Sequence, residues 1–373
     1  MSMTEPTQQQ YDSSSRPKRV RAPIWQLIVA GVVPAAAVVA VLWFIWYQKP
    51  LQEGKEFASR VMLQTSGLTR PTVNKLDSRF TDADGDFVAD APADAKDQVD
   101  PPTLVFSYVA ITQDPDNPTT DPYKAAFAEF VQHVSKVTGK PVEYHSFTSL
   151  NDQLKAMREG QLHISGFNTG GVPMAVDLCG FVPVSKLATA DGIASYRMQV
   201  IVPADSSIRS LDDVKGHELT LTEPGSNSGY KAPMVLLRDQ CGLLPERDYL
   251  LRYSGAHDSS IIGIASKKYQ AAAVAGDVLR RAVSKGEITA NQYRVVYESE
   301  FFPTACFGYV YNLKPELAGK IRRAIFDFDW KGTGMEKEFA NADQSKFVPA
   351  AFKDDWALVR KIDDATGIEY KID

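Results

Sequence analysis

Apolar positions form one long run near the start of the chain and a series of short runs after residue 102. The run at 103–109 predicts a buried strand, and apolar residues at helical spacing over 123–137 predict an amphipathic helix. Further strands are expected at 142–145 and 162–166, with a helix between them. This alternation of strand and helix predicts a parallel, doubly wound α/β sheet.

A second α/β lobe follows the first. Strands are expected at 197–203, 218–222, 269–275, 293–297 and 307–311. Helices are expected between the first four of these strands, and another at 315–328 follows the last strand. We expect two doubly wound lobes joined by a hinge, the second inserted into the first. Their predicted bounds are 102–195 (lobe 1, first part), 196–300 (lobe 2) and 301–373 (lobe 1, return segment).

The long apolar run at 24–47 predicts a transmembrane helix. It is interrupted only by Gln26 among polar side chains and is long enough to cross a bilayer core of about 30 Å. Basic residues precede it, so the polar tail 1–23 is expected to be disordered and cytoplasmic. A cleaved signal peptide is the alternative, but the run exceeds the usual h-region of about 7–15 residues and no small-residue cleavage site follows Tyr47. We expect an uncleaved single-pass anchor in the cytoplasmic membrane, with the lobes in the periplasm or outside.

Residues 48–101 are charged and rich in Ala and Asp, which predicts an acidic tether. Within it, four aspartates around Gly85 are spaced like an oxygen-ligand calcium loop. Phe87 stands where an EF-hand has its invariant Gly, and no Glu closes the loop at its twelfth position. We therefore favour a solvated linker over a weak Ca²⁺ site, and expect no other cofactor. The aspartates are Asp82, Asp84, Asp86 and Asp90.

Composition excludes several classes. The 373 residues carry a net charge of −5, which gives no footprint for nucleic acid. The three cysteines are far apart and form no CxxC pair, so neither a zinc site nor a disulfide framework is indicated. We expect small buried thiols, with one bridge and one odd thiol left open.

The stretch 221–230 joins a predicted strand to a predicted helix. Pro224 and Gly225 mark a turn, and Ser226, Asn227 and Ser228 are residue types of helix N-caps. A helix N-terminus presents unpaired N–H groups and the positive end of a dipole, so the three side chains also suit an anion cradle. A plain cap needs only one of them, and the stretch alone leaves both interpretations open.

Hydroxyl residues also head loops of lobe 1. Ligands of doubly wound sheets gather at the carboxyl ends of strands, where these loops lie. We expect the hydroxyls to face the cleft, although ordinary capping explains any single one. They are Thr112, Thr148, Ser149 and Thr169.

The lobe order and four segments carry a family resemblance. The segments are Ser-Leu-Asp-Asp-Val-Lys-Gly at 210–216, Glu-Pro-Gly-Ser-Asn-Ser-Gly at 223–229, Gly-Ala-His at 255–257 and the stretch 269–277. Together they resemble the phosphonate-binding (PhnD-like) branch of type II periplasmic solute-binding proteins, over residues 102 to the C-terminus. The resemblance implies the bilobal type II periplasmic-binding-protein fold and a monomer that delivers a small oxyanion to the permease of an ABC importer.

The resemblance also implies ligand contacts in lobe 2. The family's hydroxyls at the helix start fall on Ser226 and Asn227, beside Ser228, and its phosphonate-contacting imidazole falls on His257. An exposed turn histidine is the alternative. Tyr196 matches a tyrosine at the lobe crossing, as a ligand donor or as a cleft wall, and Asp277 matches an acidic residue for which we favour a helix cap.

Two departures from the family bear on the ligand. Leu150 stands where aminophosphonate binders have a tyrosine, and Ala305 stands where they have a carboxylate. Those groups hold the ligand's ammonium, and burying a cation without partners costs several kcal/mol. We expect an oxyanion without an amine: phosphate, phosphite or a small alkylphosphonate, with a sulfur oxyanion left open as the alternative.

An enzyme and a sensor are the two other function classes that the sequence bears on. The chain has no GxSxG elbow, no HExxH, no Walker loop and no zinc cluster, so an enzyme is not expected. The alternative is a sensor, in which the anchored lobes report the oxyanion to a membrane signalling partner.

Overall fold

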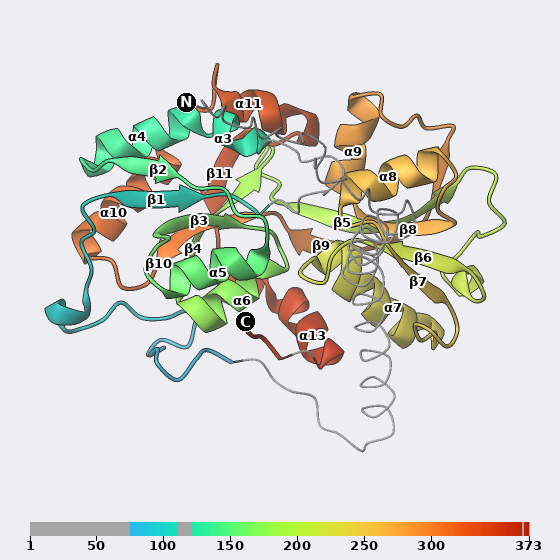
Figure 1. Ribbon diagram of the computed structural model, residues 1–373, viewed down its shortest axis with the longest axis horizontal. Coiled ribbons are helices and arrows are strands. Elements are labelled where there is room, and N and C mark those ends of the chain that lie inside the picture. The colour runs from blue at the N-terminus through green and yellow to red at the C-terminus, as the bar shows by residue number, and fades with distance from the viewer. Residues whose placement is uncertain (1–74, 111–120, 368, 373) are drawn as a thin grey trace, which may run out of the picture. The chain divides into compact units, whose positions relative to one another are not determined.

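The computed structural model describes residues 75–110, 121–367 and 369–372, all within one compact unit (Figure 1). The predicted tail, the predicted anchor, the first part of the tether and Thr112 lie outside these residues. In the part of the chain that is described, no helix has the length and apolar character needed to cross a membrane.

The first sheet has six strands in the order β11-β4-β10-β3-β1-β2. Strands β1, β2 and β3 are parallel, as the sequence predicts, whereas β10 runs antiparallel to both β3 and β4, and β11 runs antiparallel to β4. The strands are β1 (Leu104–Ser107), β2 (Val142–Tyr144), β3 (Ile164–Phe167), β4 (Phe181–Ala188), β10 (Cys306–Val310) and β11 (Lys346–Pro349).

Helices pack on this sheet around an aromatic core. Phe106 of β1 contacts the rings of Phe127, Phe130 and Phe307. The single helix expected over 123–137 is two helices that meet at the buried Phe127, and α5 and α6 lie side by side (Figure 1). The elements are α3 (Pro122–Ala126), α4 (Ala128–Thr138), α5 (Leu150–Arg158), α6 (Gly171–Cys179), α10 (Pro315–Phe326), α11 (Gly334–Phe339), η5 (Ala340–Ala342), α12 (Phe352–Asp355) and α13 (Ala357–Thr366).

The second sheet has five strands in the order β7-β6-β8-β5-β9. Strand β6 is parallel to β7 and β8, and β5 is antiparallel to β8 and β9. A helix follows the carboxyl end of each parallel strand: η4 follows β6, α8 follows β7, and α9 follows β8 directly. The elements are β5 (Ser195–Pro203), η3 (Asp212–Val214), β6 (Glu218–Leu221), η4 (Asn227–Lys231), α7 (Ala232–Cys241), β7 (Leu250–Tyr253), α8 (His257–Ala265), β8 (Ala271–Ala275), α9 (Gly276–Ser284) and β9 (Tyr293–Pro303).

The chain passes between the two sheets twice, from β4 to β5 and from β9 to β10. The two crossings are hydrogen-bonded to each other: the Thr304 N–H donates to Ala194 O at 3.2 Å and the Leu187 N–H donates to Ala305 O at 3.3 Å. Afterwards β11 pairs with β4, and Trp356 is fully buried, with its Nε1–H donating to Thr169 O at 3.0 Å. The residue bounds of the lobes given above stay predictions.

The described end of the tether differs from the expected solvated linker. Val88 and Ala89 are buried, and Val99 forms a bridge with Leu313. The Asp77 N–H donates to Asp177 O at 2.9 Å, and η2 (Ala95–Asp97) interrupts the loop. Isolated apolar residues without periodicity predict neither a helix nor a strand. Val88 and Ala89 are nevertheless buried in the folded chain. Residues 75–101 are therefore packed against the α/β body.

All three cysteines are free. Cys179 and Cys306 are buried, as expected for small thiols, and Cys241 is half-buried. The bridge that the sequence left open is absent among these three residues.

Candidate functional site

A cavity of about 300 Å³ lies where strand ends of the two sheets meet. The first sheet contributes residues that follow β1 and β3, and the second contributes residues that follow β6, β7 and β8. This is the edge at which open α/β sheets bind ligands. The polar lining residues used below are Tyr108, Thr169, Tyr196, Thr222, Glu223, Ser226, Asn227, Ser228, His257, Asp258, Asp277 and Arg281.

The structure brings seven of the eight predicted ligand-contacting residues to this cavity. The eighth, Thr112, lies outside the described residues. Of the other hydroxyls proposed for the cleft, Ser149 is the N-cap of α5, where its Oγ accepts from the Asp152 N–H at 3.1 Å. Neither Thr148 nor Ser149 lines the cavity. Capping, the alternative weighed for these loops, therefore accounts for Ser149.

Capping accounts for only one of the three polar residues at the start of η4. Ser226 is the N-cap, and its Oγ accepts from the Gly229 N–H at 3.0 Å. Asn227 is 2% exposed, and neither its Oδ1 nor its Nδ2 has a hydrogen-bond partner. Ser228 Oγ accepts from the Tyr196 hydroxyl at 3.2 Å. We call residues 226–228 the cradle; its two residues beyond the cap have hydrogen-bonding capacity that the cap does not use.

The turn that follows Ser226 is a π-helix, a rare geometry that is frequently found at functional sites. Gly229 allows it to pack closely on β6 and α8. A Cβ at this position would lie 2.0 Å from Thr222 Oγ1 and 2.9 Å from His257 Cε1, closer than real Cβ contacts come. The Ser-Gly sequence at 228–229 therefore lets the cradle lie directly against the imidazole.

His257 is the first residue of α8 and is neutral in the folded state. Its Nδ1 accepts a hydrogen bond from the Ala275 N–H at 3.2 Å, so the ring proton is on Nε2. Nε2 lies 3.4 Å from Ser226 Oγ. Burial lowers the pKa of His257 to about 4. The alternative of an exposed turn histidine is wrong, because the ring is anchored in the cavity wall and presents an N–H donor.

Carboxyl groups also line the cavity. Burial raises the pKa of both Glu223 and Asp277, partly offset by hydrogen bonds from the Gly225 N–H at 2.7 Å and the Val278 N–H at 3.0 Å. The expected helix cap at Asp277 is wrong: Ala275 is the N-cap of α9, and Asp277 is its second residue. Its carboxyl accepts from the Val278 N–H in the first turn of α9, and the residue lines the cavity.

Several lining residues escaped the sequence analysis. Thr222 Oγ1 is buried without a partner, and Tyr108 is 5% exposed. Both follow directly after a strand, so the rule that ligands bind at strand ends gave a signal for them. No sequence signal pointed to Arg281, because it lies within α9 and not at a strand end. It lines the cavity because it follows Asp277 by four residues and so lies on the same face of the helix.

Arg281 is the sole Lys or Arg among the described residues that line the cavity. Its Nη2 contacts both oxygens of Asp258, at 3.0 and 3.1 Å, so its charge is already paired. The cavity therefore offers an anion neutral donors and helix N-termini rather than a free cation.

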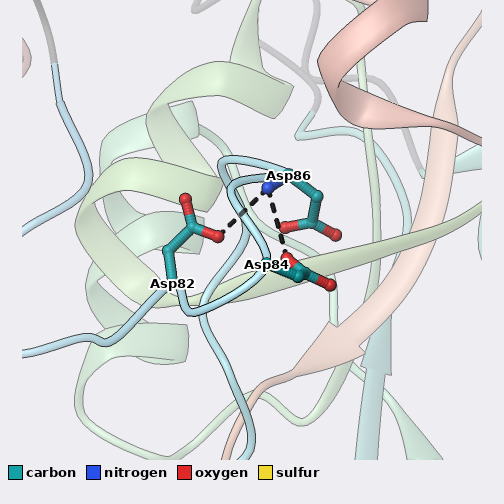
Figure 2. A group of neighbouring side chains, drawn as sticks. All are labelled: Asp82, Asp84 and Asp86. Atoms are coloured by element: carbon teal, nitrogen blue, oxygen red, sulfur yellow. Dashed lines mark hydrogen bonds between the residues drawn. The ribbon is translucent and has the colours of Figure 1, made fainter.

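Outside the cavity, three carboxylates of the acidic loop converge. One oxygen from each of Asp82, Asp84 and Asp86 lies within 4.8 Å of the others, and Figure 2 shows the Asp86 N–H donating to the first two. Asp82 also accepts from the Gly85 and Phe87 N–H groups, and Asp90 accepts from Ala83. The loop is thus held by its own carboxylates. The weak Ca²⁺ site stays the less favoured, untested alternative, which a calcium titration of the full chain would test.

Comparison with known proteins identifies the family. Residues 117–356 match the model of the family described as ABC transporter, phosphonate, periplasmic substrate-binding protein. The chain belongs to this family. Because its members are the substrate-binding components of transporters, the chain is a binding protein and not an enzyme, and the sensor alternative gains no support.

Individual relatives are distant. The chain is 24% identical over 265 residues to the phosphate-import protein PhnD of Mycolicibacterium smegmatis. The matched region covers 66% of this chain and 82% of that protein. A phosphonate-transporter binding protein of Pseudomonas aeruginosa matches with a TM-score of 0.55 at 21% identity, covering 67% of this chain and 82% of the other. PhnD1 of Prochlorococcus marinus, solved with methylphosphonate, matches with a TM-score of 0.58 at 15% identity, covering 70% and 97%. These structures support the type II periplasmic-binding fold for the α/β body.

Proposed function

We propose that this chain captures a phosphorus oxyanion without an amine, in the cavity between its two sheets, and delivers it to the permease of an ABC importer as a monomer. The observation that carries the proposal is Asn227, whose side-chain oxygen and nitrogen are both buried and unpartnered at the cavity wall. Buried polar atoms in native proteins are nearly always hydrogen-bonded, so such a pair points to a missing partner. Ser226, Ser228 and His257 are the further donors. Tyr196 orients Ser228, because its hydroxyl donates to Ser228 Oγ, and Thr169, whose Oγ1 donates to Pro303 O at 2.7 Å, lines the opposite wall.

Neutral donors suffice for useful affinity. Each hydrogen bond to an ionised group nets roughly 1.5–3 kcal/mol, and micromolar binding requires about 8 kcal/mol. Five or six such bonds exceed that figure, and the surplus is consumed by desolvation and by closure of the lobes. Neither a metal nor a lysine is needed.

The carboxyls of Glu223 and Asp277 favour a ligand that carries a proton. Hydrogen phosphate, phosphite and alkylphosphonates hold or readily take up a proton near neutral pH, whereas sulfate does not. A carboxylate facing sulfate meets only like charge. Ala305 lies in the cavity wall, on the crossing from β9 to β10. Its apolar side chain offers no carboxylate there for an ammonium group. The proposed selectivity is thus phosphate, phosphite or methylphosphonate over sulfate and aminoethylphosphonate.

Calorimetric titration of the full chain in detergent tests the ligand. We expect micromolar or tighter binding of at least one of phosphate, phosphite and methylphosphonate, with a rise in the unfolding temperature by mass action. Submicromolar binding of aminoethylphosphonate, or tighter binding of sulfate than of all three, would overturn the proposed selectivity. No binding of any phosphorus oxyanion would overturn the function.

We also propose that residues 24–47 anchor the protein in the cytoplasmic membrane with its N-terminus inside. The support is the length of the apolar run and the basic residues before it. N-terminal sequencing of the product in a membrane fraction tests this. A mature chain that begins after Tyr47 would exclude the anchor.

A further inference from the structure

A buried ion pair lies at the foot of the cradle. Lys231 is the last residue of η4, and its Nζ lies 2.6 Å from Asp363 Oδ1 in α13. The two side chains are 5% and 2% exposed. Lys231 Nζ also donates to Gly170 O at 3.2 Å, and Asp363 accepts from the Tyr370 hydroxyl. One ammonium group thus joins three segments that are far apart in the sequence.

The place where these segments meet is the contact between the two halves of the cavity. A Cβ on Gly170 would lie 2.3 Å from Gly225 O and 2.7 Å from Asn227 N, so the loop after β3 touches the backbone of the cradle. Thr169, in the same loop, lines the opposite wall of the cavity. The Lys231 side chain crosses this contact, and Arg238 Nη1, donating to Ala365 O at 2.9 Å, ties α7 to the same end of α13.

Stability alone does not explain a buried Lys–Asp pair. Desolvating two charges costs about as much as their attraction returns, and well-packed apolar residues in the same place are often as stabilising or more so. What an ion pair adds is direction, because the ammonium must meet both the carboxylate and the Gly170 carbonyl. A methionine in this position would fill the space without fixing the turn.

We propose that Lys231 is a positioning residue for the oxyanion site: its ion pair with Asp363 sets the spacing between the cradle and the Thr169 wall. The inference rests on the proposed function for its effect on ligand affinity. Its effect on the cradle itself is independent of any ligand, which allows the two to be tested separately.

The informative variant is Lys231→Met with Asp363→Leu, made in the full chain. It removes both charges, so that no unpaired charge is left buried. The matched control is Lys186→Met with Asp355→Leu, which removes a Lys–Asp pair of the same 2.6 Å length between β4 and α12. Neither Lys186 nor Asp355 lines the cavity.

Two measurements are made on each protein: phosphate affinity by calorimetry, and hydrogen exchange of the Gly229 and Lys231 amides without ligand. In the wild type both amides are bonded within the turn, to Ser226 Oγ and Ser226 O. We expect the Lys231/Asp363 variant to unfold within about 5 °C of the wild type. We expect its phosphate affinity to fall by about tenfold or more and the exchange of both amides to rise by a similar factor. The control should change neither.

Wild-type affinity together with wild-type exchange in the Lys231/Asp363 variant would overturn the proposal. If the wild type binds phosphite or methylphosphonate but not phosphate, that ligand replaces phosphate in the affinity measurement. If it binds none of the three, the proposed function fails, and the exchange result alone decides the positioning role. If the double variant does not fold, Asp363→Asn replaces it, because the amide keeps an acceptor oxygen for Lys231 while removing the charge. Faster exchange in that variant supports the proposal, and unchanged exchange refutes it.

Discussion

The Tyr196 hydroxyl donates a hydrogen bond to Ser228 Oγ across 3.2 Å, joining the first strand after the crossing, β5, to the cradle. Tyr196 is 7% exposed and Ser228 is 1% exposed, so the bond lies in the buried part of the cavity wall. The pair connects the segment that crosses between the two sheets to the proposed ligand contacts.

Tyr196→Phe should weaken phosphate binding by about three- to tenfold, because a net hydrogen bond of roughly 0.5–1.5 kcal/mol is removed and Ser228 loses its orientation. The unfolding temperature should fall only slightly, since the ring remains packed near Phe302. Calorimetry and thermal unfolding measure the two effects. Tyr309→Phe in β10 is the matched control, and equal losses of affinity in both variants would contradict the role of Tyr196.

Asn227→Asp should abolish binding of phosphorus oxyanions, with a loss of about 100-fold or more in affinity, because it places a carboxylate in the cradle. The fold should persist, since neither polar atom of the Asn227 side chain bonds to the protein. Calorimetric titration with phosphate measures the loss. Asn312→Asp, outside the cavity, is the control, and wild-type affinity in Asn227→Asp would remove the cradle from the site.

Gly229→Ala should destabilise the protein by about 1–3 kcal/mol, because the added Cβ overlaps Thr222 Oγ1. Combining it with Thr222→Ala removes the closest clash and should restore part of the loss, although the contact with His257 remains. Denaturant unfolding of the two single variants and the double variant measures the coupling. Strictly additive losses would show that the two side chains do not compete for this space.

The stability of the protein should fall as the pH drops from about 6.5 to 4, in part because of His257. Its pKa in the folded state, about 4, is below the unfolded value near 6.5, so protonation favours the unfolded chain. The stabilisation is present above pH 6.5 and is lost as the pH falls through this window. Raised pKa values at Glu223 and Asp277 act in the opposite direction, so the comparison must be with a variant.

His257→Asn supplies that comparison. The difference in unfolding free energy between the wild type and this variant should shrink towards pH 4, by no more than about 3 kcal/mol. Chemical denaturation at a series of pH values measures it. A difference that does not change with pH would mean that His257 does not titrate differently in the two states.

The α/β alternation was predictable from the sequence because buried strands and amphipathic helices each leave a periodic signal. Strand order was less so: the antiparallel entry of β10 between β3 and β4 depends on contacts between residues more than a hundred positions apart. The break at Phe127 likewise follows from packing, since that ring must lie in the aromatic core, and the local helical pattern continues through it.

The candidate site could be predicted where chemistry and position coincide in one short stretch, as at Ser226, Asn227 and Ser228. Which of the three is the cap depends on the π-turn, and no local residue pattern announces it. The direction of the His257 ring is set by the Ala275 N–H at the end of β8, and the Lys231–Asp363 pair joins residues more than a hundred positions apart in the sequence. Interactions of this kind have no signature in a single sequence.

The pairing of Arg281 with Asp258 has a consequence for the speed of capture. A cavity without a free positive charge exerts little long-range attraction on an anion, so diffusion delivers the ligand without electrostatic steering. We therefore expect the association rate constant of phosphate, measured by stopped-flow fluorescence, to change little between low and physiological ionic strength. Such a receptor would bind its ligand at nearly the same rate at low and at high ionic strength.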